Sequence, residues 1–142
     1  MRRTGVRFLE IVGAVVLVVG LGLVVFTFEL RQRGQAAMER SDAAFHHGKL
    51  RESIREAERA LLAYVPSSQH VQRAEERLVA IGRGAETEQR LDVARAAWEA
   101  LRVGYFRTTY PGKPAPSYQA EAERALARID GELARKSGAS SF

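Results

Sequence analysis

Residues 11–28 read IVGAVVLVVGLGLVVFTF, which is eighteen positions without a charged side chain. Extended back to residue 8, the apolar stretch would form ~31 Å of α-helix at about 1.5 Å per residue, enough to cross the hydrocarbon core of a bilayer. Glu10 falls within it, one turn from the end, where its carboxylate can reach the membrane interface. The stretch therefore predicts a transmembrane anchor over residues 8–28, preceded by a short basic tail over residues 1–7.

A cleavable signal peptide is the alternative explanation of this stretch. The apolar part of a signal peptide runs ~7–15 residues and ends at a site with small side chains. Here the run is longer, and residues 28–31 are a poor cleavage context, because the first alanines beyond them, Ala36 and Ala37, lie well past the end of the run. We expect the anchor to be retained as a signal anchor.

The charges that flank the anchor bear on its orientation. The N-terminal tail has three arginines and the other flank has Arg31, Arg33 and Arg40, so the positive-inside rule gives a nearly balanced count. A short basic tail before a first hydrophobic segment favours a cytoplasmic N-terminus. In a Gram-negative cell this predicts a single-pass protein of the bacterial inner membrane, with its C-terminal domain in the periplasm.

The net charge of +5 does not indicate a nucleic-acid-binding protein. Residues 1–28 contribute +2 of it, and the remaining residues carry 19 basic and 16 acidic side chains. These charges alternate, as in Arg51-Glu52, whereas a nucleic-acid footprint needs a stripe of one sign. The chain has no cysteine, which excludes disulfides, thiolate metal sites and a cysteine nucleophile.

Beyond the anchor, apolar residues recur at helical spacing. Residues 29–47 are predicted to continue the anchor as a stalk or first repeat helix, and residues 48–135 to form an antiparallel helical domain of four more helices. Residues 136–142 are a polar tail that we expect to be flexible. The predicted core stripes are Leu50, Ile54, Ala57, Leu61 and Val65; Val71, Ala74, Leu78 and Ile81; Leu91, Ala94, Trp98, Leu101 and Tyr105; and Tyr118, Ala122, Ala125, Ile129 and Leu133.

Proline and glycine mark the predicted ends of these helices. Pro66 stops the helix that starts at Leu50, and Gly82 and Gly84 stop the next one. A Pro-rich loop over residues 107–116 separates the last two helices.

The predicted helices also repeat. Residues 50–61 align with residues 91–101 at a spacing of about 41, and residues 74–81 align with residues 122–129 at a spacing of 48. The difference of seven is taken up by the longer second loop. Helical pairs that recur with such a period are typical of solenoid proteins.

The first helical pair carries a pattern of helix, tight glycine turn, Ala-rich helix and proline. Its residues are Ala44, Gly48, Leu50, Ile54, Ala57, Ala60, Leu61 and Pro66. This pattern resembles the tetratricopeptide repeat, and residues 105–111 resemble helix ends of periplasmic tetratricopeptide proteins that serve envelope assembly. The resemblance covers residues 36–133 and departs from the family at Ser53, where Ala is preferred, and at Gln89, where Gly is expected. It implies an all-α fold of helical hairpins whose motif residues are structural.

No arrangement of residues indicates catalysis. His46 and His47 precede the helix that starts at Leu50 and His70 follows it, so ~24 Å of helix separates them and they cannot share a metal. The sequence has neither a phosphate-binding glycine motif nor a serine nucleophile motif. We expect a protein that is not an enzyme, with no metal, no cofactor and no small-molecule substrate.

Aromatic residues gather around the Pro-rich loop. Trp98 and Tyr105 are expected to fill the core, because large aromatic side chains dominate small helical interfaces. The other aromatic residues and two arginines are candidates for an exposed recognition patch, since protein interfaces favour these residue types. The predicted patch consists of Phe106, Tyr110, Tyr118, Arg102 and Arg107.

Two functions fit these features. The leading hypothesis is a membrane-tethered helical-repeat adaptor or scaffold that binds a partner protein at the membrane surface, in envelope assembly or secretion. The alternative is a structural accessory subunit of a multi-subunit integral membrane complex, packed through its transmembrane helix. Gly13, Gly20 and Thr27 recur every seven residues and would line one stripe for such packing. In both cases the partners are the lipid bilayer and another protein, and not a nucleic acid.

Overall fold

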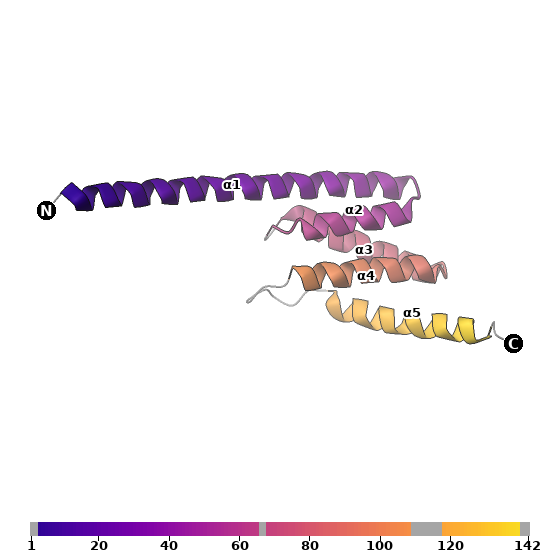
Figure 1. Cartoon of the computed structure of the whole chain (residues 1–142). Helices are drawn as coiled ribbons and strands as arrows, with labels where there is room; N and C mark the ends of the chain where they lie inside the picture. Colours follow the sequence, from indigo (N-terminus) through magenta and orange to yellow (C-terminus); the bar gives the residue numbers. More distant parts are fainter. Residues whose placement is uncertain (1–2, 66–67, 109–117, 140–142) are drawn as a thin grey trace.

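The computed structural model describes residues 3–65, 68–108 and 118–139, with side chains between residues 12 and 137 of those ranges. Across these residues the chain contains helices and turns, without a strand (Figure 1). The helices are α1 (Arg3–His46), α2 (Leu50–Leu62), α3 (Gln69–Thr87), α4 (Leu91–Arg107) and α5 (Gln119–Ala139). The prediction of an all-α chain, in which one long apolar N-terminal helix precedes a helical bundle, is confirmed.

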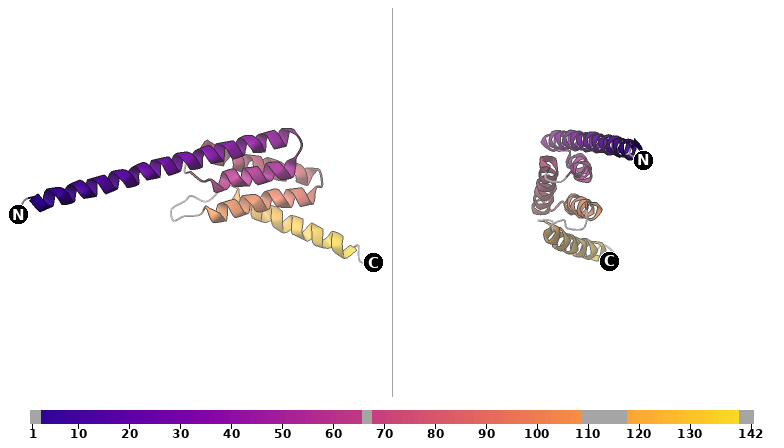
Figure 2. Two further views of the ribbon diagram at one scale, coloured as in Figure 1. Left: turned by 45° about the horizontal axis from the view of Figure 1, so that its top comes forward. Right: turned by 90° about the vertical axis from the view of Figure 1, so that its left-hand side faces the viewer.

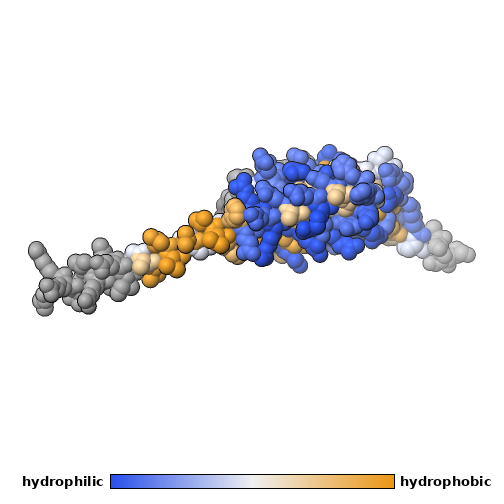
Figure 3. Space-filling view, turned by 90° about the horizontal axis from the view of Figure 1, so that it is seen from above, coloured by the Kyte–Doolittle hydropathy of each residue, from blue (hydrophilic) through white to orange (hydrophobic). Residues whose placement is uncertain are grey.

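Helix α1 is unbroken from the apolar stretch into the bundle. Every described side chain over residues 12–28 is exposed, and Figure 3 shows this part as a hydrophobic rod beside a largely hydrophilic bundle. From residue 34 onward a stripe with three- and four-residue spacing is buried against the bundle. The stripe consists of Gly34, Ala37, Met38, Ser41 and Ala44.

Consecutive helices run antiparallel, so α1, α3 and α5 share one direction and α2 and α4 share the other (Figure 1). Viewed along α1, helices α2 and α4 lie in a row between α1 and α5, while α3 packs on one side of that row (Figure 2). The α1–α2 and α3–α4 turns lie at the end of the bundle farther from the N-terminus, which we call the distal end. Helices α2 and α4 finish at the opposite end, which we call the anchor-side end.

The two distal turns have the same backbone geometry. Gly48 and Gln89 both have positive φ, at 70° and 59°, and they are 41 positions apart. In each turn the N–H of the next residue donates to the carbonyl five residues earlier, at 2.9 Å after Gly48 and 2.8 Å after Gln89. This bond satisfies a carbonyl at the helix end. The sequence repeat of 41 is therefore also a structural repeat, and Gln89 takes the left-handed conformation that glycine adopts in the first turn.

The core is built mainly from the predicted stripes. Most of their residues are buried, and the ones that are only partly buried are Leu50, Val65, Tyr118 and Leu133. Trp98 is 1% exposed, and its indole N–H donates to Glu86 Oε1 at 2.7 Å. Tyr105 is also buried, so the prediction that these two aromatic residues fill the core is confirmed.

Two predicted helix ends are wrong. Helix α3 continues through Gly82 and Gly84 to Thr87. Gly82 does not end the helix and instead permits close packing against α4. A Cβ on Gly82 would lie 2.7 Å from Cε2 of Trp98, so only glycine lets α3 and α4 approach this closely. Helix α5 runs to Ala139 and so includes the first part of the predicted tail, while residues 140–142 lie outside the described residues.

Candidate functional site

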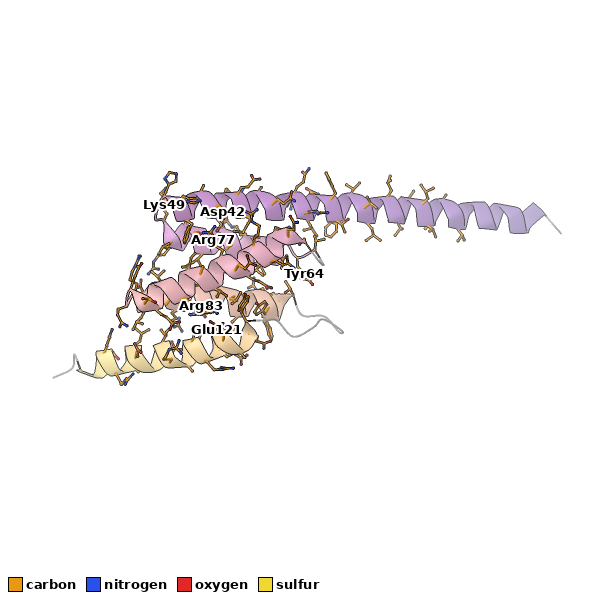
Figure 4. The ribbon with its side chains drawn as sticks, turned by 180° about the vertical axis from the view of Figure 1, so that it is seen from behind. Asp42, Lys49, Tyr64, Arg77, Arg83 and Glu121 are labelled. Carbon is orange, nitrogen blue, oxygen red and sulfur yellow. The ribbon has the colours of Figure 1, made fainter. Side chains whose placement is uncertain are left out.

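Helices α1, α3 and α5 form one face of the bundle, which we call the α1/α3/α5 face. Figure 4 looks onto this face, with Asp42 and Arg77 between α1 and α3, and Arg83 and Glu121 between α3 and α5. Two hollows lie on it, one along each of these helix boundaries. Because α1 and α3 run parallel, polar residues at the edge of each buried stripe meet across the boundary.

The α1/α3 hollow is organised around one carboxylate. Asp42 on α1 accepts hydrogen bonds from Arg73 and Arg77 on α3, each at 2.5 Å. The guanidinium carbon of Arg77 also lies 4.1 Å from the centre of the Phe45 ring, in a cation–π contact. Arg77 is therefore fixed between an anion and an aromatic face, whereas Arg73 stays largely exposed.

The α3/α5 hollow has a volume of about 360 Å³ and a bidentate ion pair at its edge. Nε and Nη2 of Arg83 donate to the two carboxylate oxygens of Glu121, at 2.7 and 2.8 Å. This hydrogen bonding from Arg83 lowers the pKa of Glu121 and raises that of the guanidinium. Bidentate pairing holds both side chains in one geometry.

A second ion pair links the floor of this hollow to α5. Glu86 Oε1 accepts from the Trp98 indole, and Glu86 Oε2 accepts from Arg128 at 2.5 Å. The hydrogen bond to Glu86 raises the pKa of Arg128. Arg124 also lines the hollow, is exposed, and has no hydrogen-bond or ion-pair partner among the described residues. The hollow thus combines a fixed charged frame with one arginine available to a ligand.

The side chains around the α3/α5 hollow form a charged and hydrogen-bonding surface. Charged groups of both signs surround a tryptophan whose ring is covered, and arginine is enriched where proteins bind one another. Within the described ranges, no three histidine, cysteine, aspartate or glutamate side chains come together in a way that would hold a metal ion. The arrangement can offer hydrogen bonds and charge pairs to a group bound in the hollow.

The residues of the predicted aromatic patch are not all alike in the structure. Phe106 is 85% exposed, and Arg102 and Arg107 are exposed on the same two turns of α4. Tyr118 is partly buried and packs against the core. Tyr110 lies outside the described residues. Phe106 and the two arginines are thus all exposed within the last two turns of α4, and Tyr118 serves the core at least in part.

The predicted packing stripe of the anchor lies on an open surface. A Cβ added to Gly13 or Gly20 would meet nothing within 4 Å. The Thr27 hydroxyl donates back to its own helix, with the carbonyls of Leu23 and Val24 at 3.0 and 2.9 Å. Thr27 therefore needs no partner helix to satisfy its hydroxyl, and the packing role of the stripe stays a prediction.

One positioning contact was missed by sequence reasoning. A Cβ on Gly34 would clash with the imidazole ring of His70, so glycine allows α1 to dock on the first turn of α3. His70 is 3% exposed, and its Nε2–H donates to the Ala63 carbonyl at 3.0 Å. The available signal was a glycine inside a predicted helix. Glycine lowers helix stability, so its presence there is typical of a position where a neighbouring element packs closely.

Comparisons with known proteins add no relative to this description. No family model matches the chain, and neither a curated protein nor a solved structure matches it.

Proposed function

We propose that this protein is a membrane-tethered helical-repeat adaptor that binds a partner protein through its α1/α3/α5 face. The observation that carries the proposal is the continuity of α1. The same helix presents an exposed apolar half and then packs its other half into the bundle, so the binding face is held at a fixed position relative to the membrane. A tether of this kind raises the effective concentration of a weak binding surface toward membrane-bound partners.

The apolar half of α1 supports the tether. It is long and apolar enough to cross a bilayer, and none of it is buried by the rest of the chain. A soluble exposed rod of this composition would be an aggregation liability, whereas a bilayer solvates it. We place the protein in a bacterial inner membrane with its N-terminus in the cytoplasm and its bundle in the periplasm.

The repeated turns support the helical-repeat assignment. Antiparallel pairs α1/α2 and α3/α4 are related by 41 positions, and α5 follows as a further helix of the same direction as α1 and α3. Tetratricopeptide-like repeats would give such an arrangement, in which helices of one direction share a face. The resemblance to envelope-assembly proteins suggests envelope assembly or secretion as the process served.

The chemistry of the α1/α3/α5 face supports a partner with an acidic segment. Arg83 and Arg128 are already paired with carboxylates, and Arg124 is exposed and makes no hydrogen bond or ion pair with the described residues. A polypeptide segment with an acidic side chain would bind Arg124 and leave the framing ion pairs in place.

Site-specific photocrosslinking in intact cells tests this proposal. A photoreactive residue at Thr87, in the α3/α5 hollow, is expected to crosslink to one discrete protein, and Arg124→Glu is expected to reduce that product at least fivefold. The matched control is a photoreactive residue at Arg55, exposed on α2. Equal crosslinking from both positions, or no effect of Arg124→Glu, would contradict partner binding on this face.

The alternative, an accessory subunit packed through the membrane helix, rests on the open small-residue surface at Gly13 and Gly20. It predicts that Gly20→Leu breaks co-purification with a membrane complex and leaves crosslinking from Thr87 unchanged. The adaptor proposal predicts that Arg124→Glu reduces crosslinking from Thr87 and leaves co-purification with a membrane complex unchanged. The two substitutions therefore separate the two candidate functions.

A further inference from the structure

The bundle exposes few large apolar side chains, and those it exposes share one end. Among the described residues outside the apolar half of α1, only Leu62 and Phe106 belong to this class, at 36% and 85% exposure. The exposure of Phe106 exceeds that of every large apolar side chain described in α1 from residue 12 onward, where Leu17 has the highest value, 69%. Leu62 is the last residue of α2 and Phe106 lies in the last turn of α4, so both are at the anchor-side end (Figure 1).

Contacts between α1 and α2 set the height of Leu62 above the apolar half. Arg40 Nε lies 2.8 Å from Glu56 Oε2, and Ser41 Oγ lies 2.8 Å from the Ser53 carbonyl oxygen. Antiparallel helices in this register place Leu62 roughly level with residue 33 of α1.

Phe106 lies at nearly the same height. A Cβ on Gly104 of α4 would lie 3.1 Å from Cδ1 of Leu61, which fixes α4 beside α2. Phe106 is two residues after Gly104 along α4 and is thus about 3 Å nearer than Gly104 to the level of the apolar half of α1. Both exposed side chains therefore lie about 6–8 Å along the axis of α1 beyond Phe28. The headgroup layer of a bilayer is about 5–7 Å thick, so both side chains are at the level of its outer edge.

The charges at this end also suit a membrane surface. Arg31 and Arg107 are exposed, and neither has an ion-pair partner among the described residues. At the two distal turns Lys49, Arg51 and Arg90 each pair with a carboxylate, that of Glu52, Asp92 and Glu88 respectively. Figure 4 separates the two ends, with Lys49 at the distal end and Tyr64 at the anchor-side end.

We propose that the anchor-side end of the bundle is a second, peripheral membrane-contact surface. Phe106 and Leu62 insert among the headgroups of the bilayer that α1 spans, and Arg31 and Arg107 bind the phosphates of anionic lipids. The inference rests on the proposed tether, which supplies the bilayer at this height. Its consequence is that the α1/α3/α5 face is held at a fixed orientation and does not swing about α1.

Quenching of fluorescence by brominated lipids tests the inference on the full-length protein. The chain has no native cysteine, so single cysteines at Leu62, Phe106, Val18 and Glu88 can each carry one environment-sensitive fluorophore. The proteins are reconstituted in vesicles of phosphatidylcholine and phosphatidylglycerol in equal parts, with bromine on the acyl chains close to the headgroup. We expect labels at Leu62 and Phe106 to be quenched at least threefold more than the exposed distal label at Glu88.

Charge provides the second arm of the test. Arg31→Glu combined with Arg107→Glu is expected to lower quenching at Leu62 at least twofold, as is replacing the vesicles by phosphatidylcholine alone. Circular dichroism of each variant confirms that the bundle is folded.

Each outcome separates this inference from the tether. If the labels at Leu62 and Phe106 are quenched no more than the one at Glu88 while Val18 is strongly quenched, the bundle stands clear of the lipid and the inference is wrong. Loss of quenching at Val18 contradicts the tether itself. Quenching at Leu62 that is the same in both lipids contradicts the assigned role of the arginines.

Discussion

The two halves of α1 have the same backbone and opposite surroundings. Residues 12–28 carry no charge and are exposed at every position, whereas residues 34–46 bury one stripe against α2 and α3. In the first half glycine faces open space, and in the second Gly34 fits against a histidine ring. The difference shows that helix formation alone does not define a structural unit here: one half packs into the bundle, and we propose that the other lies in a bilayer.

The largest expected effect concerns the first half. Val18→Arg combined with Leu21→Arg places two charges near the middle of the apolar stretch, at a cost of about 2.5–3.5 kcal/mol each in a bilayer. We expect the protein to move from the carbonate-resistant membrane fraction to the soluble fraction. Gln32→Arg with Gln35→Arg, on exposed positions of α1 outside the stretch, should leave it in the membrane. If both variants stayed in the membrane fraction, the assignment of only the first half of α1 to the membrane would be contradicted.

A large effect confined to the bundle comes from Trp98→Ala. The side chain is fully buried between α3 and α4, so its loss should lower the free energy of unfolding by about 3–5 kcal/mol. Urea titration followed by circular dichroism in detergent measures it, with the apolar half expected to stay helical. Phe106→Ala, on the same helix but exposed, should change stability by less than about 0.5 kcal/mol.

A direct contrast between the halves comes from one substitution made in each. Gly34→Ala forces a Cβ against the buried His70 ring and should lower the free energy of unfolding by about 1–3 kcal/mol. Gly20→Ala meets nothing and should cause no loss, because alanine is the better helix former. Equal effects in the same urea titration would show that the docking of α1 on α3 is not tight.

The smallest effect is a pH dependence on the α1/α3/α5 face. Hydrogen bonding from Arg83 lowers the pKa of Glu121, so this pair stabilises the bundle above the unfolded-state pKa of about 4.3. The contribution is lost as the pH falls through the lower folded-state pKa. Glu121→Gln should therefore reduce the loss of stability on acidification, measured by thermal unfolding between neutral and acidic pH. Glu76→Gln, with no ion-pair partner among the described residues, is the control.

Periodicity made most of the fold predictable. The apolar stretch and the four helical stripes are local patterns, and each stripe is buried or partly buried as expected. Glycine was harder to interpret, because the same residue type can end a helix or permit contact inside one. Gly82 was taken as a stop, yet it allows the Trp98 ring to approach α3, a contact between positions sixteen residues apart.

The candidate site was less accessible from the sequence. Arg83 and Glu121 are 38 positions apart, and their pairing depends on how α5 lies beside α3. In the sequence alone, Arg83 and Glu121 cannot be distinguished from ordinary solvent-exposed charged residues. The exposure of Phe106, in contrast, follows from its place off the apolar stripe of α4, and the sequence indicated it correctly.

A scan along α1 tests the central claim most directly. Single cysteines from residue 12 to residue 46 of the reconstituted protein, each carrying a nitroxide, report access of oxygen and of a polar relaxation reagent. The account predicts that oxygen dominates throughout residues 12–28, that polar access rises over about five residues, and that both reagents are then excluded at positions 34, 37, 38, 41 and 44. Polar access throughout residues 12–28, or no periodic exclusion after residue 34, would contradict a single helix that serves first as membrane span and then as bundle helix.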